Sequence, residues 1–205
     1  MQVKARKKSV VPAIRRSNRD KLLETGLAIM HKRGFIGASV RDIVHAAGVS
    51  QGSFTDHFPS KEAFSLEILN LYFEITQKVI EQTLRNDSMK PLKRLEAYID
   101  AHTTYLEVVG KERGCLYGNF AAEASGHSEV VRKRLVEIFA EIQKAITYCL
   151  EAAVKARELP RDFDCPEVAR FIFFSLQGAM LIGKGQRSLA PSKCFKEILF
   201  SKVLC

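Results

Sequence analysis

A short segment near the N-terminus carries polar side chains of the kind that read DNA bases. Gln51, Ser53 and Thr55 alternate with other residues, and Phe54 and Phe58 are four positions apart. If the segment is a helix, the two phenylalanines pin one face to a core and leave the polar face outward. Small polar side chains on an exposed helix can hydrogen-bond to base edges in the major groove. The pattern therefore predicts a DNA-recognition helix.

A second candidate for chemistry is Cys115, in the stretch Arg113-Gly114-Cys115-Leu116 that opens a predicted helix. The positive end of a helix dipole lowers the pKa of a thiol, and Arg113 would act in the same direction. If Lys184 lies nearby, it would stabilise a thiolate further. Cys115 and Lys184 are therefore a candidate thiol sensor. The alternative is that Cys115 is a small buried hydrophobic side chain.

Metal and cofactor sites are not expected. The five cysteines are widely spaced, odd in number and contain no CxxC pair, which argues against a zinc site and against a disulfide framework. The sequence also lacks a Gly-rich phosphate loop, a GxSxG element and an HExxH element, and Gly183-Lys184-Gly185 lacks the rest of a Walker pattern. We therefore expect no metal, no cofactor, no catalytic residues and no enzymatic activity.

The positive charge is concentrated at one end of the chain. The formal net charge is +9, and residues 1–60 hold eleven Lys and Arg against four Asp and Glu, whereas the remaining residues hold 21 against 19. An excess in one segment indicates a polyanionic partner there, although a solvated soluble tail explains the same charge. Residues 1–16, with six basic and no acidic residues, are expected to form a flexible basic arm.

Three short helices are predicted in the first sixty residues, and they would position the recognition segment. Ser17 caps the first, with Gly34 as its C-terminal cap, and the second runs from Ser39 to Gly48. Ser50 caps the third, which ends before Pro59. The tight turn Ala47-Gly48-Val49-Ser50 between the second and third is typical of a helix-turn-helix. We therefore predict a DNA-binding domain over residues 17–60.

The remainder, residues 61–205, is predicted to be a helical ligand-binding and dimerisation domain. Hydrophobic residues recur with helical spacing throughout, and no segment has strand spacing. The whole chain is thus expected to be all-α, with about nine helices. The six later helices are predicted from Ser60 to about Leu84, Pro91 to Gly110, Leu116 to Ala124, Ser128 to Arg157, from the capping pair Asp164 and Glu167, and from near Pro191.

The segment SVRDIVHAAGVSQGSFTDHFPSKEAFSLEIL resembles the DNA-binding domain of the TetR family of transcriptional regulators. The resemblance rests on Ser39, Ala47-Gly48-Val49-Ser50, Gly52-Ser53-Phe54, His57-Phe58 and Ser60-Lys61-Glu62. It implies a homodimeric DNA-binding regulator that acts as a repressor, with Ser39, Arg41, His57 and Lys61 on phosphates and Gln51, Ser53 and Thr55 on bases. Thr55 stands where the family usually has Tyr, which leaves one phosphate contact in question.

The Gly114-Cys115-Leu116 motif is similar to one in a subgroup of TetR-type regulators that respond to electrophiles, quinones, oxidants or small unsaturated acids. A small-molecule effector would bind between helices of the second domain. The candidate lining residues are Tyr72, Tyr98, His102, Tyr105, Cys115, Tyr117, Asn119, Glu123, Phe139, Phe173 and Gln177.

The eighth predicted helix is apolar on almost every face and must be covered on all sides. We expect it to form a four-helix bundle with the ninth helix and their copies in a homodimer. Such a dimer would bind a pseudo-palindromic double-stranded DNA operator.

The alternatives to a regulator are a helical enzyme, an architectural DNA-binding protein that uses charge alone, and a basic protein on acidic membranes. The last would need an apolar face that the arm lacks. The chain has no secretory signal pattern and no apolar run of about 18 residues, so a cytoplasmic location is expected.

Overall fold

The computed structural model describes residues 17–124 and 126–205, and over these residues it is helical with no strand. The predicted arm, residues 1–16, lies outside the described residues. In chain order the elements are α1 Asn18–Gly37, α2 Val40–Ala47, α3 Gln51–His57, α4 Lys61–Gln82, α5 Pro91–Val109, α6 Leu116–Ala124, α7 Glu129–Lys155, α8 Cys165–Gln186, α9 Ala190–Ile198 and a terminal π-helical turn, η1 Leu199–Val203. The all-α prediction with about nine helices is therefore confirmed for the described part of the chain.

Serine caps begin the helices of the N-terminal domain, as predicted. The Ser17 hydroxyl accepts a hydrogen bond from the backbone N–H of Asp20, and the Asp20 carboxylate accepts one from the backbone N–H of Ser17. The Ser50 hydroxyl accepts from the Ser53 N–H at 3.1 Å and so starts α3. Gly48 ends α2 with φ 64° and ψ 37°, a left-handed conformation that a glycine adopts without the strain of a Cβ.

Gly34 is a break inside α1 and not its last residue. Its φ is 75°, and helical turns continue beyond it to Gly37. A Cβ at this position would collide with the carboxylate of Glu123 on α6. The break therefore brings the end of α1 against α6, which the predicted cap did not anticipate.

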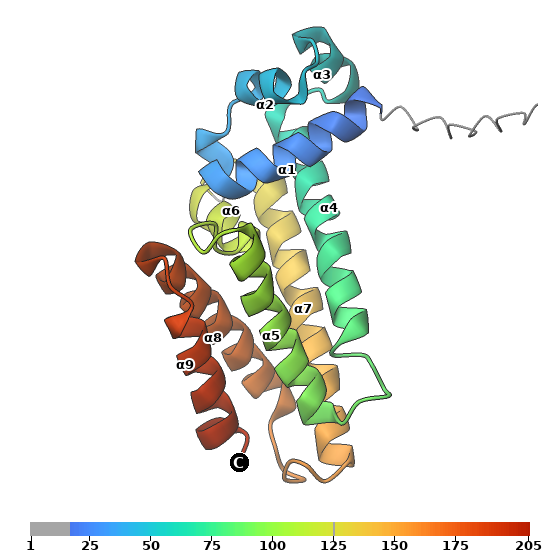
Figure 1. Cartoon of the computed structure of the whole chain (residues 1–205). Helices are drawn as coiled ribbons and strands as arrows, with labels where there is room; N and C mark the ends of the chain where they lie inside the picture. Colours follow the sequence, from blue (N-terminus) through green and yellow to red (C-terminus); the bar gives the residue numbers. More distant parts are fainter. Residues whose placement is uncertain (1–16, 125) are drawn as a thin grey trace, which may run out of the picture.

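A small aromatic core holds the three N-terminal helices on the start of α4. Phe54 and Phe58 of the α3 segment are buried, and their ring centroids lie 5.2 and 4.8 Å from that of Phe64 on α4. The prediction that both phenylalanines are core residues is confirmed. Figure 1 shows α1, α2 and α3 gathered at one end of the molecule, with α4 running from them along the helical bundle.

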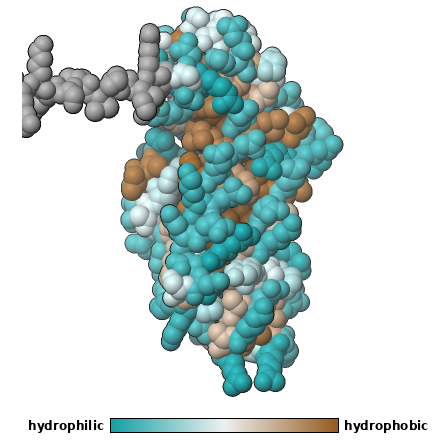
Figure 2. Space-filling model, turned by 90° about the vertical axis from the view of Figure 1, so that its right-hand side faces the viewer, coloured by the Kyte–Doolittle hydropathy of each residue, from teal (hydrophilic) through white to brown (hydrophobic). Residues whose placement is uncertain are grey.

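The bundle is built around α7, which contacts α4, α5, α6 and α8. Helices α8 and α9 pack on each other at one side of the bundle, away from α4 (Figure 1). The opposite side, which includes α4, is largely hydrophilic, with hydrophobic surface in its upper part where α1 lies against α4 (Figure 2). By length and composition α8 is apolar enough to cross a membrane. One such helix is weak evidence for a membrane span, and α8 packs on α7 and α9.

Candidate DNA-binding surface and sensing core

The outer surface of α3 presents two of the three predicted base-reading side chains. Gln51 and Thr55 are exposed, and the Thr55 hydroxyl donates to the Gly52 carbonyl at 2.9 Å. Ser53 is half-buried, and its hydroxyl accepts a hydrogen bond from the Asn18 side-chain amide at 3.1 Å. The structure thus ties Ser53 to the start of α1 and leaves Gln51 and Thr55 facing outward.

Three of the four residues predicted to contact phosphates flank this surface. Ser39, Arg41 and His57 are all exposed, and the Ser39 hydroxyl caps α2 by accepting from the Asp42 N–H at 3.0 Å. The exposed positions are compatible with contacts to a DNA backbone on either side of α3.

Lys61 is oriented differently from the other predicted phosphate contacts. Its ammonium donates to the Ile36 carbonyl at 3.4 Å and lies 4.9 Å from the centre of the Phe35 ring. Burial lowers the pKa of Lys61, and the nearby Glu123 carboxylate opposes that change. In this conformation Lys61 therefore binds the end of α1, and it must turn away from Ile36 to reach a phosphate.

A layer of polar aromatic side chains lies in the bundle and is formed by residues of α4, α5 and α6. The Tyr117 hydroxyl shares a 2.7 Å hydrogen bond with the Thr76 hydroxyl, and the Tyr72 and Tyr117 rings meet edge to face at 4.8 Å. Tyr98 is buried and packs edge to face on His102 at 4.7 Å. Burial raises the pKa of Tyr72, Tyr98 and Tyr117, so these phenols stay protonated.

A cavity of about 60 Å³ lies beside this layer, between α4 and α5. His102 contributes an imidazole whose buried Nε2 has no hydrogen-bond partner among the described residues. Burial lowers the pKa of His102 to about 4, so the ring is neutral at pH 7. The lining residues are Tyr72, Ile75, Thr76, Val79, Ala101, His102 and Tyr105.

Cys115, the residue before α6, is 9% exposed. Burial raises its pKa more than hydrogen bonds from the Gly118 and Tyr117 backbone and the Gln177 side chain lower it, so the predicted lowering of the Cys115 pKa is wrong. Lys184 lies close by, since its alkyl chain passes Gly114, but its ammonium donates to the Asn119 amide oxygen at 2.7 Å. The two candidate sensor residues are thus near each other, and the lysine ammonium is already hydrogen-bonded to the Asn119 side chain.

Asn119 and His31 join the bundle to the DNA-binding domain. The Asn119 amide donates to the carbonyls of Arg113 at 2.9 Å and His31 at 3.3 Å. His31 of α1 is 2% exposed; its Nε2 donates to the Gly114 carbonyl at 2.9 Å, and its Nδ1 lies 3.3 Å from the Tyr105 hydroxyl. Burial lowers the pKa of His31, which keeps the ring neutral and leaves Nδ1 free to accept from Tyr105.

A second contact, between α6 and the end of α1, lies nearby. The Ile36 N–H donates to the Glu123 carboxylate at 3.0 Å. Sequence reasoning missed His31 entirely and placed Glu123 only among candidate ligand residues. Their partners are 83 and 87 positions away in the chain, and no local pattern reports such a pairing.

The remaining predicted ligand residues lie apart from the α4–α5 cavity. Phe173 of α8 packs on Phe139 of α7 at 5.3 Å, and Gln177 of α8 faces Gly118 of α6. The Gln177 Oε1 atom is buried with no hydrogen-bond partner among the described residues. Of the predicted set, Tyr72, His102 and Tyr105 line the cavity, whereas Tyr98 and Tyr117 belong to the aromatic layer beside it.

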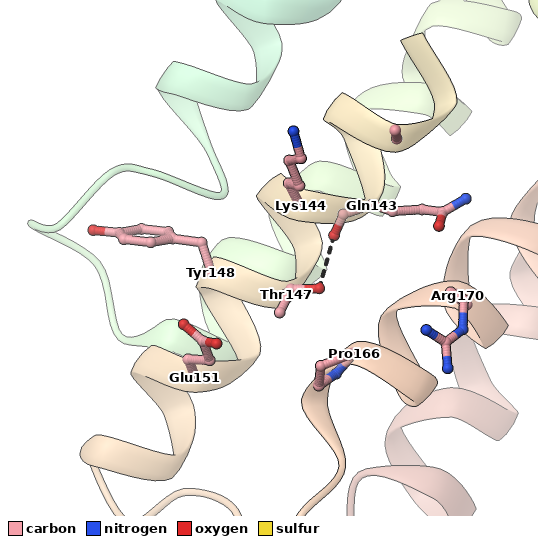
Figure 3. A pocket seen from close by; sticks show the side chains of 8 residues that line it. Gln143, Lys144, Thr147, Tyr148, Glu151, Pro166 and Arg170 are labelled. Carbon is pink, nitrogen blue, oxygen red and sulfur yellow. Dashed lines mark hydrogen bonds between the residues drawn. The ribbon is translucent and has the colours of Figure 1, made fainter. Parts of the chain in front are cut away.

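A larger, open groove of about 400 Å³ lies between α7 and the start of α8 (Figure 3). Its walls carry both charges, from Lys144, Glu151 and Arg170, and the Thr147 hydroxyl donates to the Gln143 carbonyl at 3.0 Å. None of the predicted site residues lines it. Over residues 17–124 and 126–205 there is also no group of three His, Cys, Asp or Glu arranged to hold a metal ion.

An exposed polar recognition helix, braced by a three-helix core and joined to a larger helical bundle, defines a helix-turn-helix transcriptional regulator. Comparison with known proteins agrees with this class. Residues 22–68 match the family model described as bacterial regulatory proteins of the tetR family, and residues 91–199 match the tetracyclin repressor-like C-terminal domain. The chain belongs to the TetR family, and it is a DNA-binding regulator and not an enzyme.

Individual relatives cover nearly the whole chain. The HTH-type transcriptional repressor DhaR of Mycobacterium sp. (strain GP1) is 37% identical over 91% of this chain and 92% of its own length. A crystal structure of a TetR regulatory protein from Rhodobacter sphaeroides superposes with a TM-score of 0.84 at 26% identity, covering 88% of this chain and 95% of that one. The reduced form of Escherichia coli NemR superposes with a TM-score of 0.80 at 26% identity, covering 88% and 93%.

Proposed function

We propose that the protein is a cytoplasmic repressor that binds a pseudo-palindromic operator as a homodimer and leaves it when a small molecule binds the helical bundle. The observation that carries the proposal is the exposed polar face of α3, held rigid by Phe54 and Phe58 against Phe64. Family members bind operators as dimers and respond to small-molecule effectors, and DhaR and NemR are named repressors.

In the proposed complex Gln51 and Thr55 read bases, and Ser39, Arg41 and His57 contact phosphates. All five are exposed on or beside α3. Ser53 contributes by fixing α3 to Asn18, and Lys61 adds a phosphate contact after it leaves Ile36. The basic residues of 1–16 would add affinity that depends on salt.

The proposed dimer interface is the uncovered face of α8. Phe171, Phe174, Leu181 and Ile182 are 46–60% exposed, and their spacing places them on one side of the helix; Ile198 of α9 is 50% exposed. A contiguous apolar surface of this kind marks an interaction site in a soluble protein. A second copy, applied through α8 and α9, would cover it and place the two α3 helices about one DNA turn, ~34–36 Å, apart.

Release from DNA is proposed to run through the contacts between α6 and α1. The Asn119–His31 and Glu123–Ile36 hydrogen bonds fix the DNA-binding domain on the bundle, so a shift of α6 changes the position of α1. Cys115 and Lys184 belong to this region as residues that hold the start of α6 in place. A reactive electrophile would act here by modifying a protonated, buried thiol, for which local opening is required.

The test is operator selection from a random duplex pool at one fixed salt concentration, followed by affinity measurements on Gln51→Ala. Gln77→Ala, an exposed glutamine of α4 away from α3, is the matched control. We expect wild type to select a pseudo-palindrome, Gln51→Ala to lose about 1–3 kcal/mol of discrimination at one base pair of each half-site, and Gln77→Ala to behave as wild type. Unchanged sequence preference in Gln51→Ala would contradict the assignment of α3.

A further inference from the structure

The cavity between α4 and α5 has the features of a binding site for a very small molecule. Its volume of about 60 Å³ is roughly four times the ~15 Å³ that a cavity needs to hold one water molecule, so it has room for a molecule of about four heavy atoms. We infer that this cavity is the effector site of the protein and that its effector is a small uncharged molecule with one hydrogen-bonding group. The inference rests on the proposed function, because it names the ligand class that the regulator would sense.

The effector is inferred to carry a hydrogen-bonding group because His102 lacks a hydrogen-bond partner. The residue lines the cavity, and its buried Nε2 has no hydrogen-bond partner among the described residues. A buried nitrogen left without a partner costs about 1–3 kcal/mol, and a ligand that supplies the partner recovers that energy. A neutral imidazole can donate or accept at Nε2 according to its tautomer, so a hydroxyl, carbonyl or amide group fits.

The residues that line the cavity indicate that the effector is uncharged. Among the residues that line the cavity there is no Asp, Glu, Lys or Arg. His102 is neutral at pH 7, and burial raises the pKa of Tyr72 and Tyr105, so neither phenol ionises there. A charged ligand would lose its hydration without gaining a counter-charge in the wall, which costs several kcal/mol. Arg113 acts electrostatically to lower the pKa of Tyr105, but Arg113 is not among the residues that line the cavity.

The position of the cavity gives the ligand a direct route to the DNA-binding domain. Tyr72 and Tyr105 both line the cavity and both contact His31 of α1. The Tyr72 ring meets the His31 ring at 5.7 Å, and the Tyr105 hydroxyl lies 3.3 Å from its Nδ1. A molecule that displaces either tyrosine therefore alters a buried residue of the DNA-binding domain without an intermediate helix.

The experiment compares acetamide with acetate, two molecules of nearly the same size that differ in charge. Each is titrated into the full-length protein bound to its selected operator, and the apparent Kd for DNA is measured by fluorescence anisotropy. We expect acetamide at millimolar concentration to raise that Kd at least tenfold and acetate at the same ionic strength to change it less than twofold. Benzamide, an amide too large for the cavity, should have no effect.

Two variants of cavity residues and one control variant test whether acetamide acts at the cavity. Ala101→Leu fills the cavity and should abolish the response to acetamide, measured relative to that variant's own operator Kd without acetamide. Thr104→Leu, at an exposed position of the same helix, is the matched control and should respond normally. If Ala101→Leu fails to fold, His102→Leu should raise the half-effective acetamide concentration about tenfold.

Release by acetate alone, or by neither molecule, would overturn the inference, and so would a full response to acetamide in both Ala101→Leu and His102→Leu. These outcomes leave the regulator itself intact. Failure of the unliganded protein to select any operator would instead refute the proposed function.

Discussion

His102 makes the stability of the protein depend on pH in a way that one substitution can isolate. Its pKa falls from an ordinary value of 6.5 to about 4 in the folded chain because burial disfavours the charged ring. Below pH 6.5 the unfolded chain therefore takes up a proton that the folded chain does not take up until about pH 4. This stabilisation is complete above pH 6.5 and is lost as the pH falls to about 4.

The magnitude follows from that difference in pKa. Each pKa unit corresponds to 1.36 kcal/mol, so the free energy of unfolding falls by about 3 kcal/mol between pH 7 and pH 4 on account of His102. In His102→Gln, which cannot be protonated, this fall should be absent. The assay is urea denaturation of both proteins at pH 7, 6, 5 and 4. Because other groups titrate equally in both, the difference between the two curves isolates His102; curves that remain parallel would refute the buried, neutral imidazole.

Three further outcomes are expected. Gly48→Ala should lower the free energy of unfolding by about 1 kcal/mol, since φ is +64° there, while Gly52→Ala in α3, where an added Cβ makes only an ordinary van der Waals contact with the Ser50 hydroxyl oxygen at 3.9 Å, should raise it by up to about 1 kcal/mol; urea denaturation measures both, and equal effects would argue against the turn geometry. Buried Cys115 should react with iodoacetamide much more slowly than exposed Cys194, as followed by peptide mass spectrometry, and equal rates would contradict the burial of Cys115. Leu181→Arg, which puts a charge on the uncovered face of α8, should turn the dimer into a monomer in analytical ultracentrifugation; an unchanged dimer would exclude that face as the interface.

Local features of the chain were predicted well because they depend on neighbours in sequence. The caps at Ser17 and Ser50, the left-handed turn at Gly48 and the core positions of Phe54 and Phe58 each need only the spacing of a few residues. The recognition surface followed from those elements, since a helix pinned by two phenylalanines must expose its other face.

Properties that depend on tertiary packing were not accessible in the same way. The pKa of Cys115 was predicted to fall because the helix dipole is visible in the sequence, whereas the burial that raises it comes from distant helices. Lys61 was expected to be free for DNA, but its partner Ile36 comes from the end of α1. The contact of His31 with Gly114 and Tyr105 joins segments more than seventy residues apart, so only the assembled fold reveals it.

The central claim is that two α3 helices, held by one dimer, enter successive major grooves on the same side of the duplex. The most direct measurement is the affinity of the full-length protein for its selected operator and for the same operator with five base pairs inserted between the half-sites. The insertion rotates one half-site by about half a turn of DNA. The proposed dimer predicts at least a hundredfold loss of affinity at constant salt. Equal affinity for the two duplexes would contradict the claim.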